Sequence, residues 1–82
     1  MSYNVVVNYS WEDLARTEDG FVNLEDAIQD LRNQWSAEVE EDKANGRDFE
    51  SYINEAGTYA KIVNHRANGD TDITEYRIAQ SF

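Results

Sequence analysis

"LEDAIQDLRNQWSAEVEEDKA", residues 24–44, is the longest stretch of the chain that keeps one hydrophobic period. Its apolar side chains recur three or four positions apart, which predicts an amphipathic helix over residues 24–44. Asn23 is suited to cap the start of this helix, and the sequence Ala-Asn-Gly at residues 44–46 ends it. The predicted core positions of the helix are Leu24, Ala27, Ile28, Leu31, Trp35 and Val39.

The apolar pattern of this helix fails after Val39. Asp42 takes the next position on the apolar side, where a buried carboxylate without a partner would be costly, and Glu38 lies close to that side. A helix of this length spans about 31 Å, whereas strands of six to eight residues cover about 20 to 27 Å. We therefore expect the last two helical turns to overhang the sheet and to hold their acidic side chains in solvent.

The start of the chain alternates in the manner of a strand. Residues 3–9 place one set of side chains on a core face, and the other set faces solvent. The core set is Tyr3, Val5, Val7 and Tyr9. Ser10, with Asp13 three residues later, predicts a single helical turn before the break at residues 18–20.

The end of the chain predicts a β-hairpin. Residues 58–63 and 73–79 flank the sequence RANGDTD, whose Asn-Gly pair strongly favours a turn. A three-residue loop at residues 67–69 pairs Lys61 with Glu75, and a five-residue loop preserves the same faces. The face predicted to be buried holds Ala60, Ile62, Tyr76 and Ile78.

Residues 49–56 predict a second, short helix. Asp48 would cap it and Gly57 would end it, with Phe49, Tyr52, Ile53 and Ala56 on its apolar side. The predicted order is strand, long helix, short helix, strand, strand. The fold class that follows is α+β, a three-stranded antiparallel sheet covered on one face by the long helix, in a single domain of residues 1–82.

The composition excludes several classes of site. The chain has no cysteine, so it has no disulfides, thiolate metal sites or cysteine nucleophiles, and this fits a reducing compartment. Its longest aliphatic run, at residues 5–7, is far too short to span a membrane, so we expect a cytoplasmic protein.

The net charge is the strongest compositional signal. The chain carries a formal charge of -10, and residues 1–56, with 14 acidic and 4 basic side chains, hold all of it. Such a charge repels nucleic acid and anionic lipid. We therefore expect no direct binding of nucleic acid and no membrane partner, and any charged partner should be basic.

The acidic stretch at residues 36–50 is the candidate binding surface. Carboxylates near a helix C-terminus oppose the helix dipole, so folding alone gives no reason for them, although a merely solubilising surface remains an alternative. Trp11 and Tyr52 are expected in the core, but would add contacts beside the acids if exposed. The predicted partner-binding residues are Glu38, Glu40, Glu41, Asp42, Asp48 and Glu50, with Asp26 and Asp30 as an extension along the helix.

A short, cysteine-free α+β chain with its acids massed at residues 36–50 resembles the small phage-encoded DNA mimics that inhibit host defence, the anti-CRISPR and anti-restriction proteins. The likeness lies in size, composition and charge placement over residues 12–55, and no residue motif matches. The resemblance implies an inhibitor that binds a Cas effector or restriction complex at its basic nucleic-acid channel, in the host cytosol.

An adaptor domain is the alternative to this function. An adaptor domain would bind through the open face of the sheet, where Val6, Tyr59, Val63 and Ile73 lie beside Lys61, Glu75 and Arg77.

An enzyme is not predicted. His65, with Asp72 as a possible partner, has no accompanying nucleophile. The sequence Asp-Thr-Asp at residues 70–72 lacks the spacing of a calcium loop, so no metal or cofactor is expected.

Overall fold

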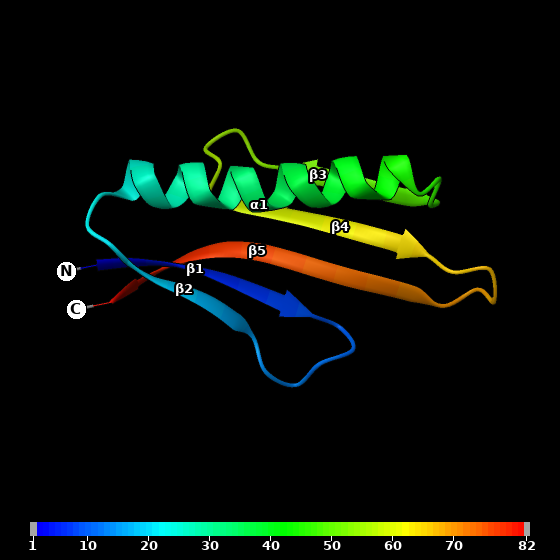
Figure 1. The fold of residues 1–82 in the computed structure, drawn as a ribbon. Coiled ribbons are helices and arrows are strands. Elements are labelled where there is room, and N and C mark those ends of the chain that lie inside the picture. The colour runs from blue at the N-terminus through cyan, green and yellow to red at the C-terminus, as the bar shows by residue number, and fades with distance from the viewer. Residues whose placement is uncertain (1, 82) are drawn as a thin grey trace.

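The computed structural model describes residues 2–81, with side chains for residues 2–80. Within these residues, one helix packs on a five-stranded sheet (Figure 1). In chain order the elements are β1 (Ser2–Tyr9), β2 (Arg16–Phe21), α1 (Leu24–Ala44), β3 (Phe49–Ile53), β4 (Tyr59–His65) and β5 (Thr71–Ser81). The α+β class is therefore correct, whereas the predicted three-stranded sheet and the order with two helices are wrong.

The sheet is antiparallel throughout, in the order β2-β1-β5-β4-β3, and α1 lies along one of its faces (Figure 1). The N-terminal strand is thus an inner strand beside the central β5. Among residues 2–81, no helix combines the length and the apolar character that crossing a membrane requires.

β2 was missed because its sequence, RTEDGF, has no apolar alternation. It pairs with β1, Val7 opposite Arg16 and Tyr3 opposite Phe21, and Phe21 alone among its residues packs against the core. The helical turn predicted from Ser10 is wrong. Instead, Ser10 is tied to β5, because its N–H donates to the Ile73 carbonyl at 2.9 Å and its Oγ accepts the Ile73 N–H at 2.9 Å.

Residues 49–53 form β3 and not a helix. Aromatic and β-branched residues suit a strand, and Phe49 and Ile53 are half-buried against the core. The side chain of Asn54 builds the following turn, since its Oδ1 accepts the N–H groups of Thr58 at 2.9 Å and Tyr59 at 3.2 Å. Gly57 has a φ of 74° in this turn, so the glycine that was predicted to end a helix shapes a β3–β4 hairpin.

The predicted β4–β5 hairpin is confirmed in its three-residue form. Lys61 lies opposite Glu75, and the Arg66 N–H donates to the Asp70 carbonyl at 2.8 Å. Gly69 takes a φ of 92°, the left-handed conformation that this loop requires. The predicted buried face is also correct, because Ala60, Ile62 and Tyr76 are buried and Ile78 packs against them.

The core lies between this face of the sheet and α1. Val5 and Val7 of β1 are buried, as predicted, and contact the same cluster as Leu31 of α1. Trp35 lies at the border of the core, where its indole N–H donates to the Lys61 carbonyl at 3.3 Å. One helix therefore covers the sheet on a single face.

The bounds of α1 match the prediction, but the helix does not overhang the sheet. β5 has 11 residues and spans about 36 Å, more than the length expected of the strands and more than the roughly 31 Å of α1. Val39 and Asp42, in the last two helical turns, are only 7% and 0% exposed. The end of the helix therefore packs on the sheet.

Asp42 is the buried charge in this contact, and the expectation that it lies in solvent is wrong. Its Oδ1 lies 2.7 Å from Arg47 Nη1, and its carbonyl accepts the Arg47 N–H at 3.0 Å. Its Oδ2 has no hydrogen bond from a described residue. The carboxylate therefore depends on Arg47 for its compensation and does not face a partner.

Replacing Arg47 with methionine keeps an unbranched aliphatic chain but leaves the buried Asp42 carboxylate without its counterion. We expect Arg47→Met to lower the urea midpoint with little change in the m-value, and Asp42→Leu/Arg47→Met to recover most of the loss, because it removes both charges. Arg66→Met is the control, with a smaller effect, because its partner Asp72 is 22% exposed. A double variant as unstable as Arg47→Met would contradict this account.

Candidate functional site

The six acids predicted at residues 36–50 do not form one surface. Asp42 is buried, and Glu40 lies on the outer side of α1, 3.6 Å from Lys43. Glu50 belongs to β3 and lies near His65 on the sheet face that α1 does not cover. Asp48 lies in the turn after α1, where its carbonyl accepts the His65 N–H at 2.8 Å.

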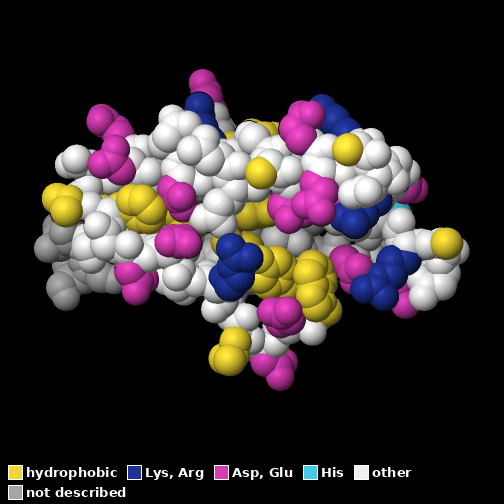
Figure 2. Space-filling view, viewed as in Figure 1, with side chains coloured by type: hydrophobic (Ala, Val, Ile, Leu, Met, Phe, Trp, Pro, Cys, Tyr) yellow, Lys and Arg dark blue, Asp and Glu magenta, His cyan; other side chains and the backbone are white. Residues whose placement is uncertain are grey.

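One side of α1 gathers the remaining predicted acids. At about 100° per residue, they fall within roughly 120° of one another around the helix axis. We call this set the acidic side of α1: Asp26, Asp30, Glu38 and Glu41. Glu38 faces Arg16 of β2 across a small cavity, so this side looks toward β2. Figure 2 shows Asp and Glu side chains along the helix and on the strands below it.

The basic residues of α1 lie elsewhere on the helix. Arg32 lies over Gly57 of the β3–β4 turn, and Lys43 is beside Glu40. Among the described residues, no member of the acidic side forms an ion pair; Asp30 accepts only the Gln34 amide at 2.7 Å. These carboxylates therefore form no ion pair with a described residue, although Arg16 and Arg47 lie near Glu38.

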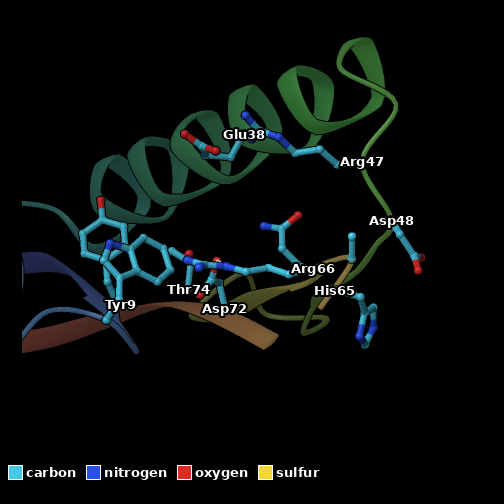
Figure 3. A pocket seen from close by; sticks show the side chains of 11 residues that line it. Tyr9, Glu38, Arg47, Asp48, His65, Arg66, Asp72 and Thr74 are labelled. Atoms are coloured by element: carbon cyan, nitrogen blue, oxygen red, sulfur yellow. The ribbon is translucent and has the colours of Figure 1, made fainter. Parts of the chain in front are cut away.

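A cavity of about 570 Å³ opens beside the acidic side, between the end of α1 and the β4–β5 hairpin. In Figure 3, Glu38 and Arg47 approach it from the helix and the turn after it, and Arg66 and Asp72 approach it from the hairpin. Its lining includes Tyr9, Trp11, Glu38, Arg47, Asn64 and Arg66.

The aromatic wall of this cavity was not expected. Trp11 was predicted in the core, but it is 51% exposed, with its ring centroid 5.0 Å from that of Tyr9. Tyr52, also predicted in the core, is 51% exposed on the uncovered face, 6.4 Å from Tyr59. The loop after β1 carries Trp11 away from the core, and no pattern in the sequence indicated the direction of this loop.

The two arginines of the cavity are already paired. Arg47 Nη1 lies 2.7 Å from Asp42, and Arg66 Nε lies 2.6 Å from Asp72. The hydrogen bonds to these carboxylates raise the pKa of both guanidinium groups. The sequence indicated the role of Arg47 only through Asp42. This acid lies on the apolar side of the helix, and a buried carboxylate needs a cation nearby.

Glu38 lies in a negative environment. Its pKa is raised first by partial burial, then by the charges of Glu41 and Asp42, and Arg47 and Arg16 offset only part of this. An added cation near Glu38 would therefore be stabilised.

The candidate catalytic residues, His65 and Asp72, do not pair with each other. His65 lies 3.3 Å from Glu50 on the uncovered face, whereas Asp72, its expected partner, pairs with Arg66. Asp70 accepts the Asn68 amide at 3.1 Å. Within residues 2–81, no group of three His, Asp or Glu side chains is arranged to hold a metal ion.

The uncovered face of the sheet carries the residues of the adaptor alternative. Strand register places Val6 of β1, Tyr59 and Val63 of β4, and Ile73 of β5 on this face. The Tyr59 hydroxyl donates to Glu75 at 2.6 Å, which raises the pKa of Tyr59 to about 12. This face is therefore apolar in part, and Tyr59 and Glu75 are paired with each other on it.

Comparison with protein-family models, curated proteins and solved structures finds no significant match to this chain. Its function must therefore be argued from its own residues.

A carboxyl whose pKa is raised on folding costs stability as the pH rises through that pKa, so removing the Glu38 charge should stabilise the fold at neutral pH. We expect Glu38→Gln to raise the free energy of unfolding by about 0.3 kcal/mol near pH 7, after solvent screening, and the gain to vanish below about pH 3.5. Urea unfolding across this range measures it. Glu40→Gln, at a 74% exposed side chain, is the control with no gain. A loss of stability in Glu38→Gln near pH 7 would refute the assignment.

Proposed function

We propose that this protein is a non-enzymatic inhibitor that binds a basic protein at the surface where that protein holds DNA or RNA. The acidic side of α1 carries the proposal. It presents Asp26, Asp30, Glu38 and Glu41 on one rigid helix, without ion pairs among the described residues. A basic groove would supply the missing counterions.

The segregation of charge on α1 favours binding over simple solubility. Both basic residues of the helix, Arg32 and Lys43, lie outside the acidic side. A solubilising surface gains nothing from this separation, because mixed charges serve it equally well. The net charge of -10 would also speed encounter with a basic partner.

The acidic side has dimensions that suit a nucleic-acid groove. Asp26 and Glu41 are 15 residues apart, which corresponds to about 22 Å along the helix axis. Four carboxylates over this length give about half the charge density of one DNA strand. The helix would therefore replace a short segment of backbone, and binding would depend steeply on salt.

The partner we propose is a basic, nucleic-acid-handling complex of host defence, such as a CRISPR–Cas effector or a restriction enzyme, acting in the host cytosol. This follows the resemblance in size and charge placement to phage-encoded DNA mimics. The protein itself would not bind nucleic acid, because of its charge, and it would need no cofactor.

Affinity capture tests this proposal. The immobilised protein is exposed to a lysate of host cells at low salt, and bound proteins are eluted in parallel with duplex DNA and with NaCl. We expect duplex DNA to release the partner, because it competes for the same groove. Partners that only high salt releases would contradict mimicry.

Two charge-matched variants locate the surface. The acidic-side variant is Asp26→Asn/Asp30→Asn/Glu38→Gln/Glu41→Gln. The control variant, with the same net charge but an intact acidic side, is Asp13→Asn/Glu25→Gln/Glu40→Gln/Glu55→Gln. We expect the first to lose the partner and the second to keep it. An equal loss in both would mean that net charge alone, and not this surface, causes capture.

The uncovered sheet face is the second candidate, as an adaptor surface, and the half-exposed Tyr52 beside Tyr59 favours it. Binding through this face would persist at high salt, because apolar contacts are not screened. The NaCl elution therefore separates the two candidates.

A further inference from the structure

We propose that the cavity of about 570 Å³ beside the acidic side of α1 receives an arginine side chain of the partner. The basic character of that partner rests on the proposed function, whereas the site itself is defined by its walls. Those walls offer an aromatic surface and a carboxylate without an ion pair, and both arginines among them are already paired with carboxylates.

The aromatic surface is formed by Trp11 and Tyr9. Their ring centroids are 5.0 Å apart with the planes at 44°, and Trp11 is 51% exposed. Both residues line the cavity. A half-exposed indole offers its face to a guanidinium, which stacks on aromatic rings and is attracted by their quadrupole.

The carboxylate is that of Glu38, the residue of the acidic side that lines this cavity. Glu38 and Tyr9 also line an adjoining cavity of about 200 Å³, so they stand where the two spaces meet. No described residue forms an ion pair with Glu38, and its pKa is raised by burial and by the Glu41 and Asp42 charges, which Arg47 and Arg16 only partly offset. A cation placed there would relieve this repulsion.

Arg47 and Arg66 in the lining do not make the cavity an anion site. Each is held by its own carboxylate, at 2.7 Å and 2.6 Å, and those contacts offset much of their charge. An acceptor oxygen without a partner supports the same conclusion. Asn64, which lines the cavity, has a buried Oδ1 with no described donor. Beside the Glu38 carboxylate, a donor-rich cation suits this region better than a phosphate does.

Arginine fits these walls better than lysine. Its guanidinium is flat and can lie against Trp11, and its N–H groups can bind the Glu38 carboxylate in a forked arrangement. A buried arginine surrounded by aromatic and acidic groups is typical of an interface hot spot. The cavity would thus supply a specific anchor, and the acidic side of α1 would supply the less specific attraction.

Titration of the isolated protein with N-acetyl-arginine amide, followed by NMR, tests this site without the partner. The two indole N–H signals separate the cavity from the core, because Trp11 lines the cavity and Trp35 is bound to the Lys61 carbonyl. We expect a saturable shift of the Trp11 signal and little change at Trp35. N-acetyl-citrulline amide, which has a similar shape but no charge, should bind at least about threefold more weakly.

Variants of the lining residues test whether the probe binds in the cavity. Glu38→Gln and Trp11→Ala should each weaken binding of N-acetyl-arginine amide by about threefold or more, whereas Glu40→Gln should leave it unchanged. Equal binding of the arginine and citrulline probes, no shift at Trp11, or a stronger response to inorganic phosphate would overturn the inference.

The outcome is independent of the capture experiment. Asp26→Asn/Asp30→Asn, at the far end of the acidic side, should reduce partner capture and leave the probe affinity within about twofold, because surface charges at this distance are largely screened. If N-acetyl-arginine amide does not bind in the cavity, this inference fails and the proposed function stands. If the probe binds but duplex DNA does not release the captured partner, the proposed function fails and this inference stands.

Discussion

The ion pair between Asp42 and Arg47 compensates a charge that is buried where the end of α1 packs on the sheet. Asp42 is fully buried, so its charge is tolerated only because Arg47 folds back from the turn after the helix to a distance of 2.7 Å. This contact ties the last turn of α1 to the turn that leads into β3. Together with Ala27, Leu31 and Val39, the buried Asp42 marks the side of α1 that faces the sheet.

The charge distribution follows from the spacing of the acids along α1. This spacing places Glu38 and Glu41 on the same side as Asp26 and Asp30, whereas Glu40 is on the outer side beside Lys43. In the same arrangement, Arg47 and Glu38 line one side of the cavity, and Trp11 and the β4–β5 hairpin line the rest. The buried pair therefore connects the packing of the helix to both surfaces that we assign to binding.

The elements that the sequence predicted correctly have strong local signals. The 3.6-residue period gave the bounds of α1, alternation gave the buried face of β1, and Asn68-Gly69 gave the register of the β4–β5 hairpin. The two edge strands were missed because their pairing is set by tertiary contacts. β2 has almost no apolar residues, and the spacing of Phe49 and Ile53 in β3 also fits a helix. β5 is longer than the expected strand of residues 73–79, so the expected overhang of the helix and the solvent position of Asp42 are wrong. The cavity could not be foreseen, because the exposed Trp11 that lines it was expected in the core.

Native-state amide hydrogen exchange along α1 tests most directly whether the end of the helix is docked. The docked arrangement predicts that residues 39–44 exchange within about tenfold of the protection seen for residues 31–35, because both segments pack on the sheet. Exchange of residues 39–44 at rates near those of an unfolded chain, with residues 31–35 still protected, would mean that the helix overhangs. The acidic side and the cavity would then lack the fixed geometry on which both proposals depend.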